Sequence, residues 1–309
     1  MTGDDMTGRP LVSVVVPTRN RWEALDRCLS ALLVQDWPVD RFEVIVVNDG
    51  GTDGTGRVLA RRAGGAPRLR CIHAGGRGPA AARNAGIRSA RGTIVAFTDD
   101  DCIPDPDWLR MIAERLERAD LVGVGGLTYS DPDSITPFTH QVEDAHPYSF
   151  PTCNVAYRRE ALAAAGGFDE DYPHPYNEDW DLVFAMQRIG VIAYEPFMRV
   201  RHPPRPVTFM HELSRLRYLA SEFRLFTKYR EQYRASVHRH PWRVILYHHG
   251  LVQPVLRLVR HGRRAARHPW LFIRLLALLI IERLYLLWLL PGFINHDRRE
   301  RERTVTSCT

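Results

Sequence analysis

The first half of the chain alternates continuous apolar runs with segments in which apolar residues recur at helical spacing. The runs are rich in valine and isoleucine, as in "LVSVVVP" and "FEVIVV", and are typical of strands buried on both faces of a parallel sheet. They predict five strands, at residues 11–17, 42–47, 69–72, 93–97 and 121–126.

Helices are predicted between these strands. Apolar residues recur on one face of residues 22–32, and a helix of small residues spans 79–90, beginning with a proline, which is favoured at the first helical position. Asp105 is expected to cap a third helix that begins at Pro106. Strands that alternate with helices predict an α/β fold whose Rossmann-like, mostly parallel sheet is flanked by helices.

Polar and glycine-rich loops follow the first four predicted strands. Because ligands of open α/β sheets bind at the carboxyl ends of the strands, these loops would line one crevice. A single loop of this composition is usually only a turn, but four at one edge favour a binding site. They read "PTRN" (17–20), "NDGGTDGTG" (48–56), "HAGGRGP" (73–79) and "TDDDC" (98–102).

Three consecutive carboxylates, Asp99, Asp100 and Asp101, come directly after the fourth predicted strand. Hard divalent cations such as Mg²⁺ and Mn²⁺ prefer carboxylate oxygens and keep open positions for substrate phosphates. A bound cation would also relieve the repulsion among the three charges. The acidic triplet, residues 99–101, is therefore a candidate metal site.

The composition, 45% hydrophobic and 25% charged, is that of a globular chain. Its five cysteines are odd in number and scattered, and they form no C-x-x-C pair, which argues against a disulfide framework or a zinc site. The polar start "MTGDDMTGRP" lacks the basic and apolar parts of a secretion signal. These features predict a cytoplasmic location.

Charge is distributed unevenly along the chain. Residues 199–309 contain 22 Arg and Lys against 7 Asp and Glu, whereas residues 1–198 contain 20 against 29. The basic C-terminal region reads as long helices, of which the last apolar stretch is "LFIRLLALLIIERLYLLWLL" (271–290). Arg274, Glu282 and Arg283 within it make a simple membrane span costly. An anionic membrane surface is the favoured partner, with the protein peripheral on the inner face of the plasma membrane. The alternative is a helix buried against the rest of the chain or a second subunit.

Five ordered motifs carry a resemblance to a known family. They are "VSVVVPTRNR", "VIVVNDGGTDGT", "GPAAARNAGIRSARGTIVAFTDDDC", "CNVAYRREALAAAGGFDE" and "NEDWDLVFAMQRIG". In order and spacing they resemble the family 2 inverting glycosyltransferases of the GT-A fold. The resemblance implies a catalytic domain at residues 10–205, followed by a basic helical C-terminal region at 206–309. It also implies a Mn²⁺- or Mg²⁺-dependent transfer of a sugar, of the hexosyltransferase type, from a UDP-, dTDP- or GDP-sugar to a glycan or glycolipid acceptor, with no nucleic acid partner.

The resemblance assigns roles to residues of the four loops. It implies that Asp49 recognises the nucleotide base, with Pro17, Thr18 and Arg19 forming another side of that pocket. Asp53 reads better as a helix cap. Within the acidic triplet the resemblance implies that Asp101 binds the metal, and that Asp99 and Asp100 contact the ribose or support the site. Asp99 is also a candidate metal ligand, because it is only two positions from Asp101 in the sequence. The remaining candidates for nucleotide or phosphate contact are Arg77 and Arg83.

The segment "YNEDWDL" supplies a catalytic base. Asn177 reads as the N-cap of a helix, which places Glu178 and Asp179 in a first turn that favours ionised carboxylates. The resemblance implies Asp179 as the base that takes the proton of the acceptor hydroxyl, with Glu178 in acceptor binding or support. It also implies His202 as a candidate metal ligand.

Two other classes of protein are compatible with parts of this sequence. A haloacid-dehalogenase-like phosphatase also places D-x-D after a strand, although Ile103 stands where such a motif expects Thr or Val. A non-catalytic nucleotide-sugar-binding membrane scaffold is disfavoured, because candidate metal and base residues are both present.

Overall fold

The computed structural model describes residues 11–63, 68–136, 138–145, 149–172, 174–236, 240–266 and 269–306. They divide into two compact units. The first unit comprises the described residues of Met1–Asp131, Gln141–Asp171 and Glu178–Pro203, and the second those of Pro132–His140, Tyr172–Asn177 and Pro204–Thr309.

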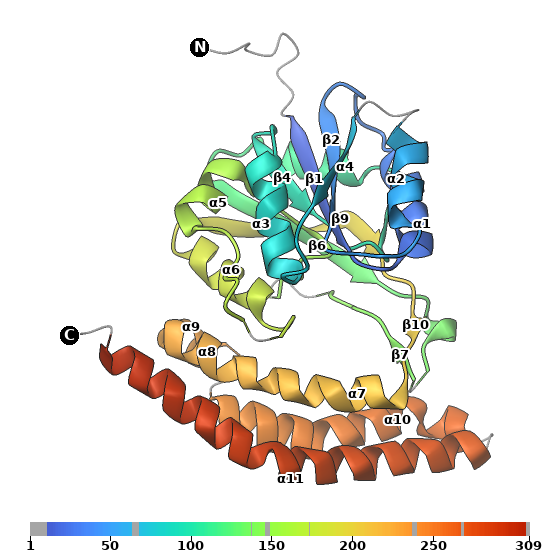
Figure 1. Ribbon diagram of the computed structural model, residues 1–309, viewed down its shortest axis with the longest axis vertical. Helices are drawn as coiled ribbons and strands as arrows, with labels where there is room; N and C mark the ends of the chain where they lie inside the picture. The colour runs from blue at the N-terminus through green and yellow to red at the C-terminus, as the bar shows by residue number, and fades with distance from the viewer. Residues whose placement is uncertain are drawn as a thin grey trace. The chain divides into compact units, whose positions relative to one another are not determined.

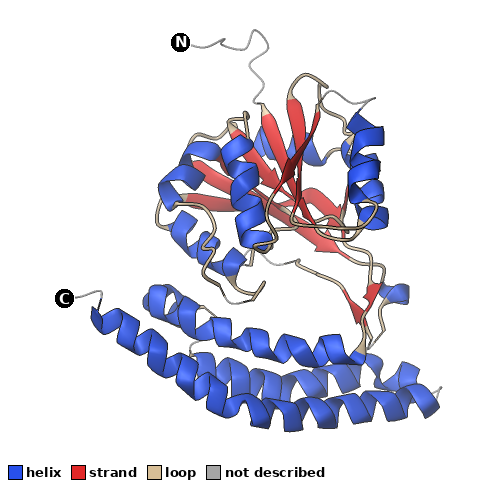
Figure 2. Cartoon of the chain, viewed as in Figure 1, coloured by secondary structure: helices blue, strands red, loops and turns tan. Residues whose placement is uncertain are grey.

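One eight-stranded sheet forms the centre of the first unit (Figures 1 and 2). The five strands predicted from apolar runs are present, and the fifth extends three residues further than expected. In sheet order the strands are β3 (Leu69–His73), β2 (Phe42–Asn48), β1 (Val12–Thr18), β4 (Ile94–Phe97), β8 (Val155–Arg158), β6 (Leu121–Tyr129), β9 (Val191–Arg201) and β5 (Ile103–Pro104).

The sheet is mixed and mostly parallel. β3, β2, β1 and β4 run parallel, whereas β8 lies antiparallel between β4 and β6. β6 pairs with β9 in parallel, and the short β5 pairs with β9 antiparallel. The parallel part brings the ends of β1, β2, β3 and β4 to one edge, as the loop pattern predicts.

Helices cover both faces of this sheet (Figure 1). Their apolar sides pack in two clusters, because successive residues of β1 point to opposite faces: Val14 joins one cluster and Val15 the other. On the Val14 face lie α1 (Trp22–Leu32), α2 (Thr55–Ala63) and α4 (Trp108–Arg115). On the Val15 face lie α3 (Pro79–Ser89), α5 (Arg159–Ala165) and α6 (Glu178–Gln187).

Two expected helix caps differ from the structure. Asp105 does not cap α4, whose N-cap residue is Asp107; the Asp105 carboxylate instead accepts a hydrogen bond from the Tyr129 hydroxyl at 3.0 Å. The prediction was wrong because β5 extends the chain past Ile103 before the helix begins. Asn177 directly precedes α6, but its φ of 72° is left-handed rather than the extended conformation of an ordinary N-cap.

The second unit is helical, as expected for the C-terminal region. A core that includes Leu219, Phe223, Leu286 and Phe293 holds its helices together. In the part of the chain that the structure describes, no helix combines the length and apolarity needed to cross a membrane. The elements of the second unit are η1 (Pro132–Ser134), β7 (Thr139–His140), β10 (Arg205–Pro206), α7 (Phe209–Arg215), η2 (Leu216–Ala220), α8 (Ser221–Lys228), α9 (Arg230–Ala235), η3 (Arg243–Val252), α10 (Gln253–Ala266) and α11 (Pro269–Thr306).

Candidate active site

The acidic triplet begins two residues after β4, at the edge where the parallel strands end. Asp100, its middle residue, is buried, and its two carboxylate oxygens accept hydrogen bonds from the Thr18 hydroxyl at 2.7 Å and from Arg21 Nη1 at 3.1 Å. Burial raises the pKa of Asp100 to about 6, against the opposing attraction of Arg21. Asp100 therefore ties the end of β1 to the end of β4.

Arg21 is a site residue that the sequence analysis missed. Its Nη1 lies 3.1 Å from Asp100 and 3.0 Å from Asp101, so one guanidinium bridges two neighbouring carboxylates. The available signal was its place directly after the "PTRN" loop, at an edge where strands one and four lie side by side. Arg21 offsets part of the repulsion within the triplet.

Asp101 and His202, two of the residues expected to bind the metal, lie close together. His202 follows β9, and its Nε2 lies 3.6 Å from Asp101 Oδ1. Among the described residues, the ligand atoms of Asp101, Cys102 and His202 lie within 4.8 Å of one another. A carboxylate and an imidazole fit Mn²⁺, whereas burial raises the pKa of the Cys102 thiol well above its usual value, which keeps it protonated. Asp99 does not join this group.

Asp99 is instead paired with Arg83. Arg83 Nη2 lies 2.9 Å from Asp99 Oδ1, and its Nη1 lies 3.1 Å from Glu178 Oε1. The Arg83 side chain is only 6% exposed and stacks over the Phe168 ring at 5.6 Å from its centroid. Arg83 is thus a buried cation that joins the acidic triplet to the first turn of α6. From the sequence alone, Arg83 could equally have been a partner in an ion pair on the surface.

Glu178 and Asp179 begin α6. Burial and the neighbouring Asp179 charge raise the pKa of Glu178 to about 7, while Arg83 opposes this shift. Burial also raises the pKa of Asp179, although this residue keeps part of its surface exposed to solvent. Its Oδ1 accepts a hydrogen bond from the Trp180 amide at 2.8 Å. A carboxylate with a raised pKa at a helix N-terminus is suited to take up a proton.

Asp49 is held by the loop that follows β3. Its two oxygens accept hydrogen bonds from the backbone amides of Arg77 at 3.0 Å and Gly78 at 2.8 Å. Gly78 has a φ of 98°, a conformation that favours glycine. Asp49 therefore fixes the turn that leads into α3, while the Arg77 guanidinium pairs with Glu170 at 3.2 Å.

The end of β1 and the loop after β2 are also tied together. Asp53 accepts hydrogen bonds from the amides of Thr55 at 3.0 Å and Trp22 at 3.1 Å. It therefore caps α2, as its sequence context predicts, and it also caps the start of α1, which was not predicted. Pro17 is partly buried in β1, and Arg19 is exposed just beyond its end. The side chain of Arg19 reaches the loop that contains Gly76. A Cβ atom added to Gly76 would lie 3.9 Å from Arg19 Nη1.

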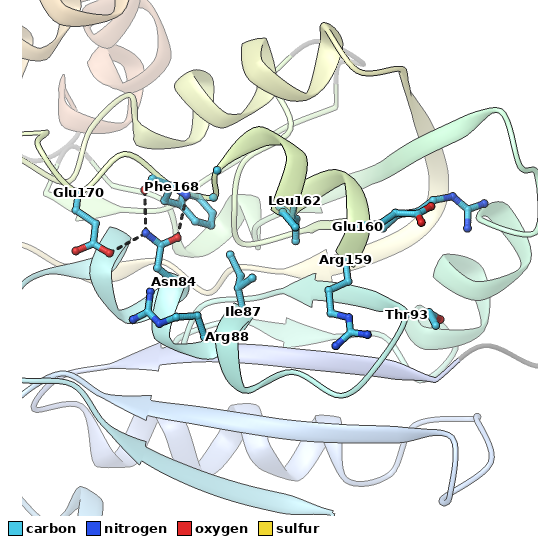
Figure 3. A pocket seen from close by; sticks show the side chains of 13 residues that line it. Asn84, Ile87, Arg88, Thr93, Arg159, Glu160, Leu162, Phe168 and Glu170 are labelled. Carbon is cyan, nitrogen blue, oxygen red and sulfur yellow. Dashed lines mark hydrogen bonds between the residues drawn. The ribbon is translucent and has the colours of Figure 1, made fainter. Parts of the chain in front are cut away.

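A groove of about 930 Å³ runs along α3 and α5 (Figure 3). At one end, the Asn84 amide donates at 2.8 Å to both the Phe168 carbonyl and Glu170, and accepts from the Phe168 amide at 2.9 Å. The acidic triplet and residues 178–179 do not line this groove. It is therefore separate from the reacting groups considered above.

Comparison with known proteins identifies the family. Residues 13–168, about half of the chain, match Glycosyl transferase family 2. The chain belongs to glycosyltransferase family 2. Its members are inverting enzymes that use nucleotide sugars, which decides against the phosphatase and scaffold alternatives.

Several proteins of this kind are similar in sequence. Glycosyltransferase AglE of Haloferax volcanii is 29% identical over 61% of this chain and 68% of its own length. An uncharacterized glycosyltransferase, EpsJ of Bacillus subtilis, is 33% identical over 52% of each chain. Validoxylamine A glucosyltransferase of Streptomyces hygroscopicus is 28% identical over 59% of this chain and 52% of its own. The chain thus spans about half the length of the last two relatives.

Solved structures agree with the fold. The mannosyltransferase PcManGT of Pyrobaculum calidifontis, in complex with GDP-Man and Mn²⁺, superposes with a TM-score of 0.57 at 23% identity, over 96% of this chain and 87% of its own. Residues 1–349 of TarS from S. aureus give a TM-score of 0.55 at 18% identity, over 96% and 92%. The chain therefore has a GT-A-like fold.

Proposed function

We propose that this glycosyltransferase moves a hexosyl group from a UDP-, dTDP- or GDP-sugar to a hydroxyl of a glycan or glycolipid acceptor, with Mn²⁺ or Mg²⁺ bound. The observation that carries the proposal is the pairing of Arg83 with both Asp99 and Glu178. Arg83 is a buried cation that links Asp99, expected on the donor side of the site, to Glu178, expected on the acceptor side.

Asp101 and His202 are the proposed metal ligands, supported by their 3.6 Å approach and by the Mn²⁺ in the PcManGT complex. When bound, the cation neutralises charge on the departing diphosphate. Asp100 holds the loop through Thr18 and Arg21, and Asp99 contacts the ribose or supports the site through Arg83. Arg21 keeps Asp101 in place.

Asp49 is proposed to recognise the base from the loop it organises, with Pro17, Thr18 and Arg19 on another side of the pocket. Because both Asp49 oxygens already accept a backbone amide, the carboxylate is fixed in orientation, and its remaining lone pairs can accept from a base N–H. Arg77, whose side chain is largely exposed, is the proposed phosphate contact.

Asp179 is the proposed base. The acceptor oxygen forms its bond to the anomeric carbon while the bond from that carbon to the diphosphate oxygen breaks, and the hydroxyl proton passes to the Asp179 carboxylate. The raised pKa of Asp179 favours this transfer. Glu178, held by Arg83, positions the acceptor side of the site.

The four described cysteines are free thiols, which supports the cytoplasm as the compartment of the reaction.

The test is a screen of purified protein against a panel of nucleotide sugars with Mn²⁺, Mg²⁺ or chelator. We expect one donor to be consumed only with metal, and Asp101→Ala to abolish that consumption. Equal turnover in chelator, or release of phosphate from simple phosphomonoesters, would refute the proposal.

A further inference from the structure

The helices η3, α10 and α11 of the second unit expose an apolar surface. On α11, Trp270, Ile273, Ile280, Leu284 and Trp288 are all exposed, and their spacing of three, four or seven residues places them in one stripe. Leu284 is 62% exposed and Trp288 is 67% exposed. Single exposed apolar residues need no explanation, but a continuous stripe marks an interaction surface.

The buried carboxylate of α11, Glu282, lies on the opposite side from this stripe. Glu282 is buried, and its carboxylate accepts hydrogen bonds from Arg257 at 2.7 Å and Arg283 at 3.1 Å. Arg257 also donates to the buried Glu212 at 3.1 Å. The inner side of α11 thus combines buried apolar residues such as Leu278 and Leu286 with one paired carboxylate, while other leucines and tryptophans of the same helix stay exposed. α11 is therefore apolar on its outer side as well as its inner side, unlike an ordinary surface helix.

A second exposed row lies on the neighbouring helices. Tyr247, Leu251, Val255 and Val259 follow one another at intervals of four residues along η3 and α10. Leu258, Phe272, Leu275 and Leu279 form one cluster, so α10 and α11 lie side by side, as Figure 1 also shows. Both rows thus lie on helices that pack against each other. The exposed apolar residues between 246 and 294 are called the apolar face below.

Exposed cations accompany this face. Arg243, Arg260, Arg274, Arg298 and Arg299 are exposed on the same three elements. Within a Debye length of an anionic leaflet each such residue is attracted to the surface. A two-fold interface between copies of this chain would instead bring the arginines of one copy near those of the other, which disfavours a second copy as the occupant.

We propose that the apolar face inserts into the headgroup region of an anionic membrane, with α11 lying in the plane of the bilayer. The stripe from Trp270 to Trp288 is about 27 Å long at 1.5 Å per residue. Trp270, Trp288 and Tyr247 suit the boundary between headgroups and acyl chains, where amphipathic rings concentrate. This inference does not depend on the proposed reaction.

The test is cosedimentation of the full chain with vesicles of phosphatidylcholine or of phosphatidylcholine mixed equally with phosphatidylglycerol. We expect binding to the mixed vesicles that weakens at high salt. Leu284→Gln with Trp288→Gln lowers partitioning by about 100-fold, since each large apolar side chain removed from the interface is worth about tenfold. The matched control is Phe197→Gln in the first unit, where Phe197 is equally exposed at 67%; it leaves binding unchanged.

The thermal unfolding of the double variant separates lost contact from lost folding, because both side chains are exposed and the transition is expected not to move. Equal partitioning of wild type and double variant overturns the proposal. So does a wild-type dimer in analytical ultracentrifugation that the double variant converts to monomer without any vesicle binding, which would assign the face to a second copy.

Discussion

Replacing Arg83 by methionine removes the cation that joins the two halves of the candidate site. Methionine fills much of the same volume but leaves Glu178, whose side chain is 9% exposed, without its partner at 3.1 Å. Breaking a buried pair by removing one partner costs about 3–5 kcal/mol, because the other charge stays buried. We therefore expect the free energy of unfolding at about pH 8 to fall by that amount.

Arg77→Met is the matched control. Arg77 pairs with Glu170 at 3.2 Å, but its side chain is largely exposed, so the loss is expected to be about 1 kcal/mol or less. Urea denaturation of both variants, followed by circular dichroism, gives the comparison. Adding Glu178→Gln to Arg83→Met recovers most of the lost stability, because the uncompensated charge is then absent.

The pH dependence has a definite sign. The pKa of Glu178 is already raised to about 7, and removing Arg83 raises it further. A buried carboxyl of this kind stabilises the fold below its unfolded pKa and loses that contribution as the pH rises through its folded pKa. The deficit of Arg83→Met therefore shrinks as the pH falls toward 5. A deficit no larger than that of Arg77→Met, or one that grows on acidification, would refute the reasoning.

Three further outcomes follow from the same contacts. The wild type is expected to lose stability between about pH 4.5 and pH 7, because the pKa of Glu178 is raised on folding, and Glu178→Gln removes this loss. The measurement is the unfolding free energy of both proteins as a function of pH. Parallel curves would contradict the raised pKa. Asp53→Ala removes the caps of α1 and α2 and costs about 1–2 kcal/mol in urea denaturation, whereas an unchanged midpoint would mean that the caps contribute nothing. Gly86→Ala places a Cβ 2.3 Å from Val15 Cγ1 and costs about 1–3 kcal/mol, while Gly56→Ala, which meets nothing within 4 Å, leaves stability equal or slightly higher.

The sequence was sufficient for the parallel part of the fold, since β1, β2 and β4 are mostly apolar and each is followed by a loop rich in turn residues. β8 has no such signal, because it is only four residues long and ends in an arginine that donates to the carbonyls of Leu121 and Leu116. The antiparallel insertion therefore appears only in the structure.

Site residues were predictable where a local pattern accompanies the chemistry. The triplet after β4 and the pair at the start of α6 stand out in the sequence, and Asp53 sits two residues before the helix it caps. Arg21 and Arg83 could not be paired in this way. Their partners lie 79 and 80 residues away for Arg21 and 16 and 95 for Arg83, and only the folded sheet brings such positions together.

The exposed apolar side of α11 was equally out of reach of sequence patterns. Arg274, Glu282 and Arg283 made the segment look like a poor membrane span, but their spacing does not tell which of them face inward. The ion pairs of Glu282 with Arg257 and Arg283 supply that information, since they fix the buried side of the helix.

The central claim is that Asp101 serves the metal and nucleotide while Asp179 serves the acceptor. The most direct measurement compares Asp101→Ala with Asp179→Asn by calorimetric titration of nucleoside diphosphate in Mn²⁺ and by sugar transfer. We predict that Asp179→Asn binds nucleotide like the wild type and loses about 10²–10⁴-fold in transfer, whereas Asp101→Ala loses Mn²⁺-dependent binding itself. Equal nucleotide binding by the two variants, or transfer by Asp179→Asn at the wild-type rate, would contradict the account.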